Sequence, residues 1–334
     1  MKNSRMLRIM MVVCAVIVVA AVAASVRGIF GGSPFGYADA EKYTAGEAQI
    51  SGTVRNLEID WLNGKVTLEY HSGEGVELRE ASSRPISADM QLRWWLDGDT
   101  LRVRYAKSGF RLTWDQEKEL TVSVPEGCSF QDVNIRATSG ELDLPDVKAD
   151  TLNLEVTSGD IRAASEARII AAGATSGNIS LQAAGETETV SVGTTSGSAY
   201  VEAYEMDTVK ATTTSGGIQI SADHVKMCDA GATSGNVLIN LAEAEQVKIG
   251  STSGTVSVKL AKFTSLKADT TSGTITAELP EKPGFTAQIN TVSGSIDDDM
   301  ALSREGSRFV CGDGSAKVEL GSTSGDIRLR KAGQ

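Results

Sequence analysis

Few residues in this chain have the types and spacing that metal binding or catalysis requires. The best metal candidates are three consecutive acids, Asp297, Asp298 and Asp299, because clustered carboxylates can bind a hard cation such as calcium. Successive side chains of a strand point to opposite faces, so three neighbours cannot all face one ion. We therefore expect a solvated acidic loop here and keep calcium binding as the weaker alternative.

Candidates for nucleophilic or general acid/base catalysis are weaker still. The only histidines are His71 and His224, and both lie in polar stretches. The sequence has no H-E-x-x-H motif, no Cys-x-x-Cys pair and no nucleophile elbow. Serines are abundant, but abundance does not place a Ser/His/Asp triad. We predict no catalytic residue and no cofactor, and we expect that the protein is not an enzyme.

Composition narrows the class of partner. The chain of 334 residues carries 43 acids and 32 bases, for a formal net charge of -11. Binding to duplex nucleic acid needs a cationic stripe that displaces counterions from phosphates, and no such stripe occurs. The hydrophobic content of 41% is too high for a disordered polar chain. We therefore expect a folded protein without a nucleic-acid partner.

The part of the chain that would hold any functional site is built from an internal sequence repeat. Between residues 139 and 325 Ser-Gly recurs ten times, usually as Thr-Ser-Gly, and seven of the nine successive gaps lie within one residue of nineteen. Fixed spacing of this length is typical of a stacked repeat fold. We predict that each glycine forms a structural turn, because such corners often need the positive φ that a Cβ resists. The glycines are Gly140, Gly159, Gly177, Gly197, Gly216, Gly235, Gly254, Gly273, Gly294 and Gly325.

Hydrophobic alternation on both sides of each Ser-Gly predicts β-strands. The position seven residues before the glycine is aliphatic, as in Val133 and Val247. The position two residues after the glycine is aliphatic as well, as in Ile161 and Ile275. A period of two means that every second side chain is buried, so we expect two short strands per repeat. Antiparallel hairpins would reverse the strand direction at each turn, whereas here the same asymmetric motif repeats in the same direction along the chain. This favours a parallel arrangement of the strands. The predicted fold is therefore all-β, a parallel β-solenoid of about 19 residues per coil over residues 131–331.

The cysteines fit this register. Cys228 occupies an inward column about four coils away from Cys311, which is roughly 19 Å and beyond the reach of a disulfide. We expect a buried, unpaired thiol at Cys228.

Residues 47–130 follow the repeat only in part. A divergent coil begins at Leu57, with Gly64 in the place of the corner glycine. The register then breaks, and bulky residues from Met90 to Trp114 are candidates for the cap that a solenoid end needs. Near the other end, the long gap between Gly294 and Gly325 holds a polar insertion that leads into the predicted final coil.

The amino terminus predicts a membrane segment. Lys2, Arg5 and Arg8 precede an uncharged run over residues 9–26, which as a helix would be about 27 Å long and near the thickness of a bilayer. We predict that residues 1–27 form a single-pass anchor in the lipid bilayer, or alternatively a cleaved secretory signal. Residues 28–46 are expected to be a linker. The positive-inside bias places the amino terminus in the cytoplasm and the rest of the chain outside the membrane.

Some of the sequence repeats resemble those of a known family. Thr323-Ser324-Gly325-Asp326-Ile327 and the opening Ile59-Asp60-Trp61-Leu62-Asn63-Gly64 are similar to repeats of the bacterial putative-adhesin family, over about residues 50–331. The resemblance implies β-strand repeats, often behind one membrane span, and brings no catalytic residues.

Three functions are compatible with these features. The first is a membrane-anchored surface protein without catalysis, with an adhesin-like or scaffold role toward another protein, a glycan or a wall polymer. The second is a component of cell-envelope stress sensing, which fits the association of some related proteins with stress operons. The third is a β-helical glycan lyase or hydrolase, which would require carboxylates or a basic residue converging on one groove.

Overall fold

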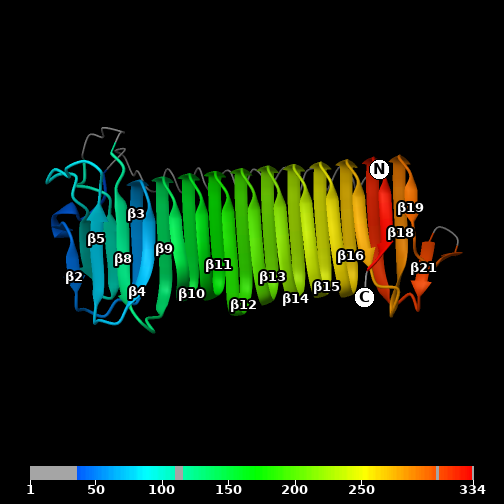
Figure 1. Cartoon of the computed structure of the whole chain (residues 1–334), viewed down its shortest axis with the longest axis horizontal. Helices are drawn as coiled ribbons and strands as arrows, with labels where there is room; N and C mark the ends of the chain where they lie inside the picture. The colour runs from blue at the N-terminus through cyan, green and yellow to red at the C-terminus, as the bar shows by residue number, and fades with distance from the viewer. Residues whose placement is uncertain (1–35, 110–115, 306–307, 333–334) are drawn as a thin grey trace. The chain divides into compact units, whose positions relative to one another are not determined.

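The computed structural model describes residues 36–109, 116–305 and 308–332, and these form β-strands with one short 3-10 helix, η1 (Ala40–Lys42) (Figure 1). The expected all-β fold is confirmed. The chain divides into two compact units, here called the amino-terminal unit, which ends at Ala184, and the carboxyl-terminal unit, which begins at Gly185. The predicted anchor over residues 9–26 lies outside the described residues, and in the part that is described no helix is long and apolar enough to cross a membrane.

The carboxyl-terminal unit stacks one strand per coil in parallel. Val209 pairs with Cys228, Cys228 with Val247 and Val247 with Leu266, so the offset of nineteen residues predicted from the sequence is the inter-strand register. The strands are β13 (Ala199–Ser215), β14 (Ile218–Ser234), β15 (Val237–Ser253), β16 (Val256–Ser272) and β17 (Ile275–Leu279), after β12 (Ile179–Ser196), which crosses the boundary between the units.

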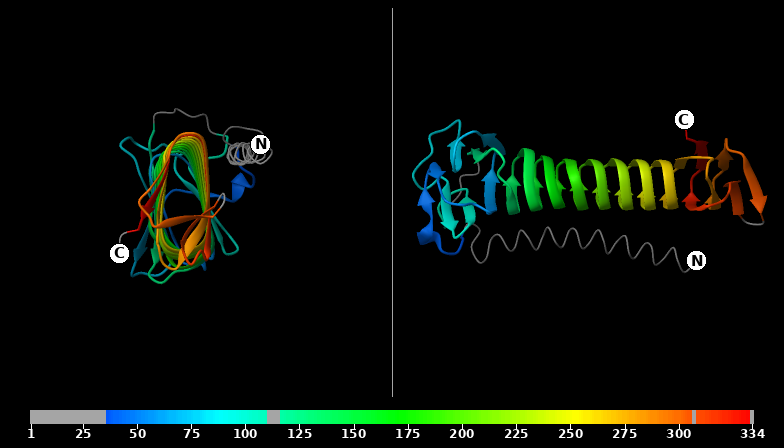
Figure 2. Two further views of the ribbon diagram at one scale, coloured as in Figure 1. Left: turned by 90° about the vertical axis from the view of Figure 1, so that its right-hand side faces the viewer. Right: turned by 90° about the horizontal axis from the view of Figure 1, so that it is seen from below.

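Each of β13 to β16 is one continuous strand from corner to corner, although the sequence predicted two short ones. The residues between the two predicted strands belong to the same strand, and Met206, Val225 and Ala244 among them are buried. Around the bend the buried residues stand three apart, as in Ala203, Met206 and Val209, and the strand still pairs with the next coil there. Seen end on, the coils of the carboxyl-terminal unit form a flattened ring (Figure 2).

The amino-terminal unit has the same construction. β9 (Phe130–Ser139), β10 (Leu142–Ser158) and β11 (Ile161–Ser176) are parallel, with Leu152 between Val133 and Ile170. One coil is a residue shorter than its neighbour, and the register shifts between Leu144 and Val147 to absorb the difference. Such a bulge keeps the inward columns aligned on both sides of it.

The core consists of the inward positions that the hydrophobic alternation of the sequence predicts, stacked in columns from coil to coil. Side chains seven residues before and two residues after the corner glycines, among them Val133, Leu152, Ile275 and Ile327, are buried, and Ile296 after Gly294 is the exposed exception. Cys228 is fully buried without a disulfide, as predicted. Burial of aliphatic side chains between neighbouring coils supplies the main stabilising term of such a stack.

At the start of the amino-terminal unit the chain does not stack coils in sequence order. The divergent coil lies between the later strands β7 and β8 on one side and β9 and β10 on the other, with Leu57 paired to both Leu101 and Val133. Its pairing with Val133 follows the predicted register. The strands of these outer coils are β3 (Asn56–Asn63), β4 (Val66–His71), β7 (Thr100–Arg104) and β8 (Glu119–Pro125).

Antiparallel strands cover the outermost of these coils. β5 (Val76–Ala81) pairs with β8, and β6 (Arg93–Asp97) pairs with β7. β1 (Thr44–Ala45) and β2 (Ala48–Ile50) extend this layer by pairing with β6 and β5. The cap predicted from Met90 onward is thus built on β6, while Trp114 lies outside the described residues. The linker predicted over residues 28–46 is wrong from residue 36 onward, because Tyr37 and Tyr43 pack against each other and β1 joins the sheet.

The far end of the carboxyl-terminal unit corrects another expectation. The repeat with Gly325, predicted to be the final coil, is inserted between the repeats with Gly273 and Gly294. The strands involved are β18 (Gly284–Ser293), β19 (Ile296–Asp298), β22 (Ala316–Ser324) and β23 (Ile327–Lys331), with an antiparallel hairpin of β20 (Leu302–Glu305) and β21 (Arg308–Gly312) before β22.

The apolar columns explain this order. A coil covered on both sides needs inward residues without charge, and Val318, Leu320, Ile327 and Leu329 of the inserted repeat are buried. The repeat with Gly294 places Asp298 where its counterparts are apolar, and this carboxylate is exposed at the end of the stack. The outermost position therefore tolerates a charge that an inner position would have to desolvate.

Candidate binding groove

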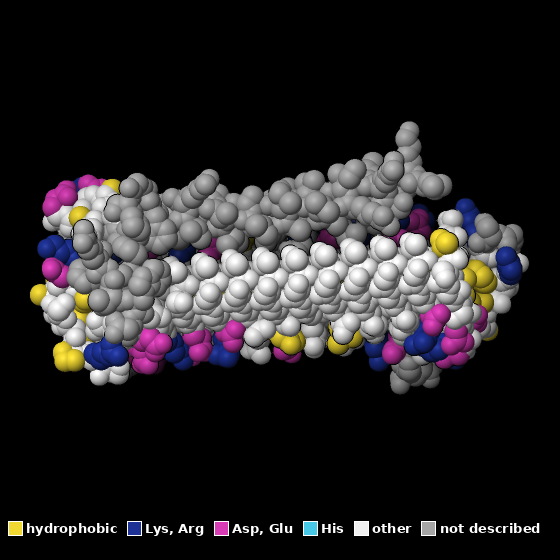
Figure 3. Space-filling view, turned by 90° about the horizontal axis from the view of Figure 1, so that it is seen from above, with side chains coloured by type: hydrophobic (Ala, Val, Ile, Leu, Met, Phe, Trp, Pro, Cys, Tyr) yellow, Lys and Arg dark blue, Asp and Glu magenta, His cyan; other side chains and the backbone are white. Residues whose placement is uncertain are grey.

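The ten Ser-Gly pairs form the corners of the coils. Eight of the glycines have φ between +132° and +157°, and the exceptions are Gly235 and Gly294. In each unit the glycines of successive coils lie so close together that a side chain would not fit: a Cβ on Gly216 would lie 1.8 Å from the Gly197 carbonyl oxygen, and one on Gly159 would lie 1.9 Å from that of Gly140. The corners are a close backbone contact, and their face carries mainly uncharged small side chains (Figure 3).

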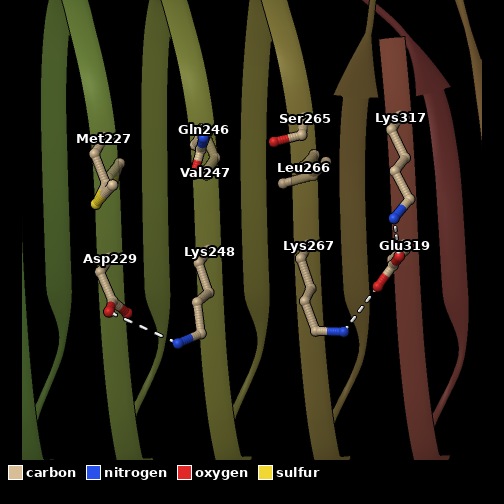
Figure 4. Close-up of a pocket in the computed structure, with 11 residues that line it drawn as sticks. Met227, Asp229, Gln246, Val247, Lys248, Ser265, Leu266, Lys267, Lys317 and Glu319 are labelled. Atoms are coloured by element: carbon tan, nitrogen blue, oxygen red, sulfur yellow. Dashed lines mark hydrogen bonds and ion pairs between the residues drawn. The ribbon is translucent and has the colours of Figure 1, made fainter.

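A shallow groove lies on the outer surface of the carboxyl-terminal unit, over β14, β15, β16 and β22. Its volume is about 350 Å³. The floor is the backbone around the buried residues Cys228, Val247 and Leu266, whose side chains point inward. Because neighbouring positions on a strand point outward, two rows of side chains border this floor. One row is Met227, Gln246, Ser265 and Lys317, and the other is Asp229, Lys248, Lys267 and Glu319 (Figure 4).

Lysines from three adjacent strands reach this groove. Lys267 Nζ lies 2.8 Å from a Glu319 carboxylate oxygen, and Lys317 Nζ lies 2.6 Å from the other oxygen, so the two ammonium groups converge on one carboxylate (Figure 4). Lys248 Nζ is 3.9 Å from Asp229, which is a looser contact. Three lysines against Asp229 and Glu319 leave the lining with an excess of positive charge, whereas the chain as a whole is acidic.

The pKa values reflect this arrangement. Hydrogen bonds from Lys267 and Lys317 lower the pKa of Glu319 to about 2. The hydrogen bond to Glu319 raises the pKa of Lys267. Beside the groove, Asp269 lies 3.7 Å from Lys267, and its pKa is raised because the carboxyl is largely desolvated. At neutral pH Glu319 and Lys267 are therefore charged.

The three acids proposed as a weak metal site are at the end of the carboxyl-terminal unit, away from this groove. Asp297 is 2.5 Å from Arg330, and Asp299 accepts a hydrogen bond from the backbone N–H of Lys331. Within the described ranges no group of three or more His, Cys, Asp or Glu side chains is placed to hold a metal ion.

The two histidines lie in different units. His71, at the end of β4, contacts the backbone of Gly73 and Gly75. His224 lies in the carboxyl-terminal unit on β14, with its ring 6.0 Å from that of Tyr204 and one ring nitrogen 3.6 Å from Glu243. Neither histidine lines the groove.

Sequence reasoning missed a buried lysine in the amino-terminal unit. Lys118 stands where the outer coil would have its corner glycine, directly above Gly64, and its side chain is fully buried. Its ammonium lies 2.8 Å from Glu80, donates to the carbonyl oxygens of Met90 and Tyr105, and sits over the Trp61 and Tyr105 rings at 5.0 and 4.2 Å. Desolvation lowers the pKa of Lys118 despite the bond to Glu80. Only the mismatch of lysine with glycine at this repeat position could have signalled it.

These features define a class of protein: a repeat protein of parallel β-coils that presents rows of side chains at regular intervals on its outer surface. The chain belongs to the family described as Toastrack DUF4097, whose model matches residues 54–169 and again residues 164–330. This agrees with the resemblance drawn from the Thr-Ser-Gly rungs. Among curated proteins none matches this chain.

Solved structures of several bacterial proteins are similar to this chain over most of its length. A protein of Parabacteroides distasonis described as a putative adhesin is 12% identical with a TM-score of 0.48, over 86% of this chain and 97% of that one. A second protein of that species, described as a putative lipid binding protein, is 14% identical with a TM-score of 0.44, over 86% and 96%. A putative adhesin of Bacteroides fragilis is 12% identical with a TM-score of 0.36, over 86% and 97%. Similarity at this level carries no conclusion about function.

Proposed function

We propose that this chain is a membrane-anchored, extracytoplasmic binding protein that holds an anionic surface polymer in the groove over β14, β15, β16 and β22. The observation that carries the proposal is the placement of Lys248, Lys267 and Lys317 on three adjacent strands that line one groove. Adjacent strands repeat at about 4.8 Å, so a linear polymer with regularly spaced carboxylates or phosphates can meet several ammonium groups at once.

The direct test uses lysine-to-glutamine variants of the full chain in detergent. Lys248, Lys267 and Lys317 are replaced together, and the control replaces Lys226, Lys259 and Lys262, which lie in the same unit and are also ion-paired. Both variants lose three charges, so only position differs. With alginate and polyphosphate as probes in low-salt binding assays, the groove variant should bind at least about tenfold more weakly, and the control should stay within about twofold. Equal losses in both variants would show unspecific attraction and contradict the proposal.

The proposed location rests on the amino-terminal sequence. An uncharged run over residues 9–26 follows Lys2, Arg5 and Arg8, and the first acid is Asp39. An anchored chain of this orientation exposes its coils outside the membrane. Protease added to intact cells or spheroplasts should degrade the coils while the membrane fraction retains the amino-terminal segment. Protection of the coils from protease would contradict this placement.

Binding without catalysis is part of the same proposal. A glycan-cleaving enzyme needs one carboxyl that stays protonated near neutral pH to act as the general acid. Glu319, the carboxylate at the centre of the lysines, has a pKa of about 2 and cannot serve in that role.

One observation supports a second candidate function, the cleavage of an acidic glycan. Asp269 and Glu319 both lie beside Lys267, and their pKa values are displaced in opposite directions. Opposed shifts in neighbouring carboxyls are a pattern of acid/base pairs. Release of reducing ends from alginate or another acidic glycan, lost in an Asp269→Asn variant, would favour this function over binding alone.

A further inference from the structure

A second surface of the carboxyl-terminal unit carries large apolar side chains that the core does not use. Among the described residues six large hydrophobic side chains are exposed, and three of them lie on β13 and β15, the two neighbours of β14. Tyr200 and Tyr204 on β13 are 45% and 64% exposed, and Leu238 on β15 is 42% exposed. Clustered apolar groups on a surface often mark a binding site.

The outward residues of β13, β14 and β15 after the corner glycines arrange these groups in a flat array. Tyr200, Glu202 and Tyr204 alternate with buried residues and so point to the same side of β13. Tyr200 pairs with Gln219 of β14, which pairs with Leu238 of β15, and Glu202 is followed in the same way by Ser221 and Asn240. We call this surface the tyrosine face and define it as Tyr200, Glu202, Tyr204, Gln219, Leu238 and Asn240.

The dimensions of the tyrosine face follow from strand geometry. The Cα atoms of Tyr200 and Tyr204 are four residues apart on one strand, about 13 Å, and the polar groups of the next two strands follow at steps of about 4.8 Å. The two rings are thus separated by the Glu202 carboxylate and flanked by two amides and a hydroxyl. The tyrosine side chain combines an apolar ring with a polar tip, which suits a ligand that has both kinds of surface.

Neighbouring side chains fix one edge of the tyrosine face. The Tyr204 ring meets the His224 ring edge to face at a centroid distance of 6.0 Å, and a ring nitrogen of His224 lies 3.6 Å from Glu243. This row extends across β13, β14 and β15. A ring held in one orientation loses less conformational entropy when a ligand stacks on it.

The charge of the tyrosine face excludes the ligand proposed for the groove. Glu202, Glu205 and Asp223 are outward on β13 and β14, and Glu243 on β15 is paired with Lys262 of β16. The bases beside this surface are His224 on β14 and Lys259 and Lys262 on β16, and both lysines are ion-paired. A polyanion would be repelled here, whereas the groove has an excess of lysines. The two surfaces share β14 and β15 but use different residues, so they select different partners.

We propose that the tyrosine face is a binding site for a neutral glycan. A pyranose ring presents an apolar C–H face that packs on an aromatic ring, and its hydroxyls donate to carboxylates and exchange hydrogen bonds with amides. Tyr200 and Tyr204 would each stack one sugar, Glu202 would accept hydroxyl hydrogen bonds between them, and Gln219 and Asn240 would bind the neighbouring edge. A neutral glycan carries no charge, so an acidic surface that repels polyanions does not repel it.

The test measures binding of the full chain in detergent to neutral polysaccharides, with dextran, glucomannan and a soluble β-glucan as probes in affinity electrophoresis. Tyr200→Ser and Tyr204→Ser should each weaken binding about fivefold, which corresponds to about 1 kcal/mol, and the double variant should abolish it. Tyr200→Phe and Tyr204→Phe keep the ring and should keep most of the affinity. The control is Met227→Ser, which removes an exposed apolar side chain from the groove and should leave glycan binding unchanged.

Other outcomes overturn the proposal. Wild-type binding in the double serine variant would show that the rings do not contribute. Loss in the phenylalanine variants equal to that in the serine variants would show that the hydroxyls, not stacked rings, bind the ligand. Binding of polylysine in place of every neutral glycan would assign the face to a cationic partner. The groove variant with three glutamines should bind neutral glycans normally, so the two binding functions fail separately.

Discussion

The ammonium of Lys118 lies 2.8 Å from a carboxylate oxygen of Glu80, and both side chains are buried, with exposed fractions of 0% and 5%. A pair of this kind costs a large desolvation energy, which the mutual attraction and further hydrogen bonds repay. Here the further bonds go from Lys118 to the carbonyl oxygens of Met90 and Tyr105. The pair therefore joins β5 and the chain before β6 to the outermost coil.

Removing one partner of this pair should be costly. Lys118→Met leaves the Glu80 carboxylate buried without its cation, and we expect the free energy of unfolding to fall by about 3–5 kcal/mol. The double variant Lys118→Met with Glu80→Leu should be more stable than the single variant, because no buried charge remains unpaired. Guanidinium titrations followed by tryptophan fluorescence measure both. A single variant as stable as the wild type would mean that the pair is not buried in solution.

The corner glycines predict a contrast between two alanine substitutions. At Gly216 the φ is +146° and a Cβ would lie 1.8 Å from the Gly197 carbonyl oxygen, so Gly216→Ala should cost more than about 2 kcal/mol or prevent folding. Gly231 lies in the next coil, and a Cβ added there would have no atom within 4 Å, so Gly231→Ala should be neutral or slightly stabilising. Thermal melting of the two variants compares them directly, and similar melting temperatures would contradict the close packing of the corners.

Inward hydroxyls three residues before the corner glycines predict another contrast. Thr270 Oγ1 is buried and has no hydrogen-bond partner in the described part of the chain, whereas Thr213 Oγ1 in the same column donates to the Gly197 carbonyl at 3.3 Å. Thr270→Val should raise the free energy of unfolding by about 1 kcal/mol, because it removes a buried polar group. Thr213→Val should lower it by a similar amount. Urea titrations of both variants test the signs, and a loss of stability at Thr270 would point to an unseen partner for its hydroxyl.

The groove predicts an acid-dependent part of the stability. The pKa of Glu319 falls from 4.5 to about 2 on folding, so the folded state binds fewer protons than the unfolded state between these values. The stabilisation by Lys267 and Lys317 is therefore complete above pH 4.5 and is lost as the pH falls toward 2. Solvent screening limits it to about 1 kcal/mol.

Melting temperatures measured from about pH 6 to about pH 2 should show this loss in the wild type. Glu319→Gln should have a lower melting temperature at the upper end of this range and a weaker dependence on pH. Glu245→Gln, which changes an exposed glutamate of β15 outside the groove, should keep the dependence of the wild type. Identical pH profiles for the wild type and Glu319→Gln would show that Glu319 does not bind the two lysines.

Much of the interior could be predicted from the sequence because a repeat fold uses the same local rule in every coil. Alternation around each Ser-Gly places Val209, Val247 and Leu266 in one buried column, and their spacing of nineteen residues is the register between strands. The buried Cys228 follows from the same parity. The predicted break into two strands was wrong for β13 to β16, where one strand runs through the bend and buries Met206 and Val225 at a spacing of three residues that alternation does not predict.

The sequence by itself determined which residues face the core and how far apart paired residues stand, because alternation and repeat length are local properties of the chain. Only the tertiary structure decided which coils are neighbours at the ends, where the divergent coil and the repeat with Gly325 are each inserted between two others. Spacing is uninformative there, because long insertions interrupt it and the choice depends on which coil can bury all its inward side chains. The groove follows from that choice: Lys317 and Glu319 stand beside Lys267 because β22 pairs with β16, across 52 residues of sequence.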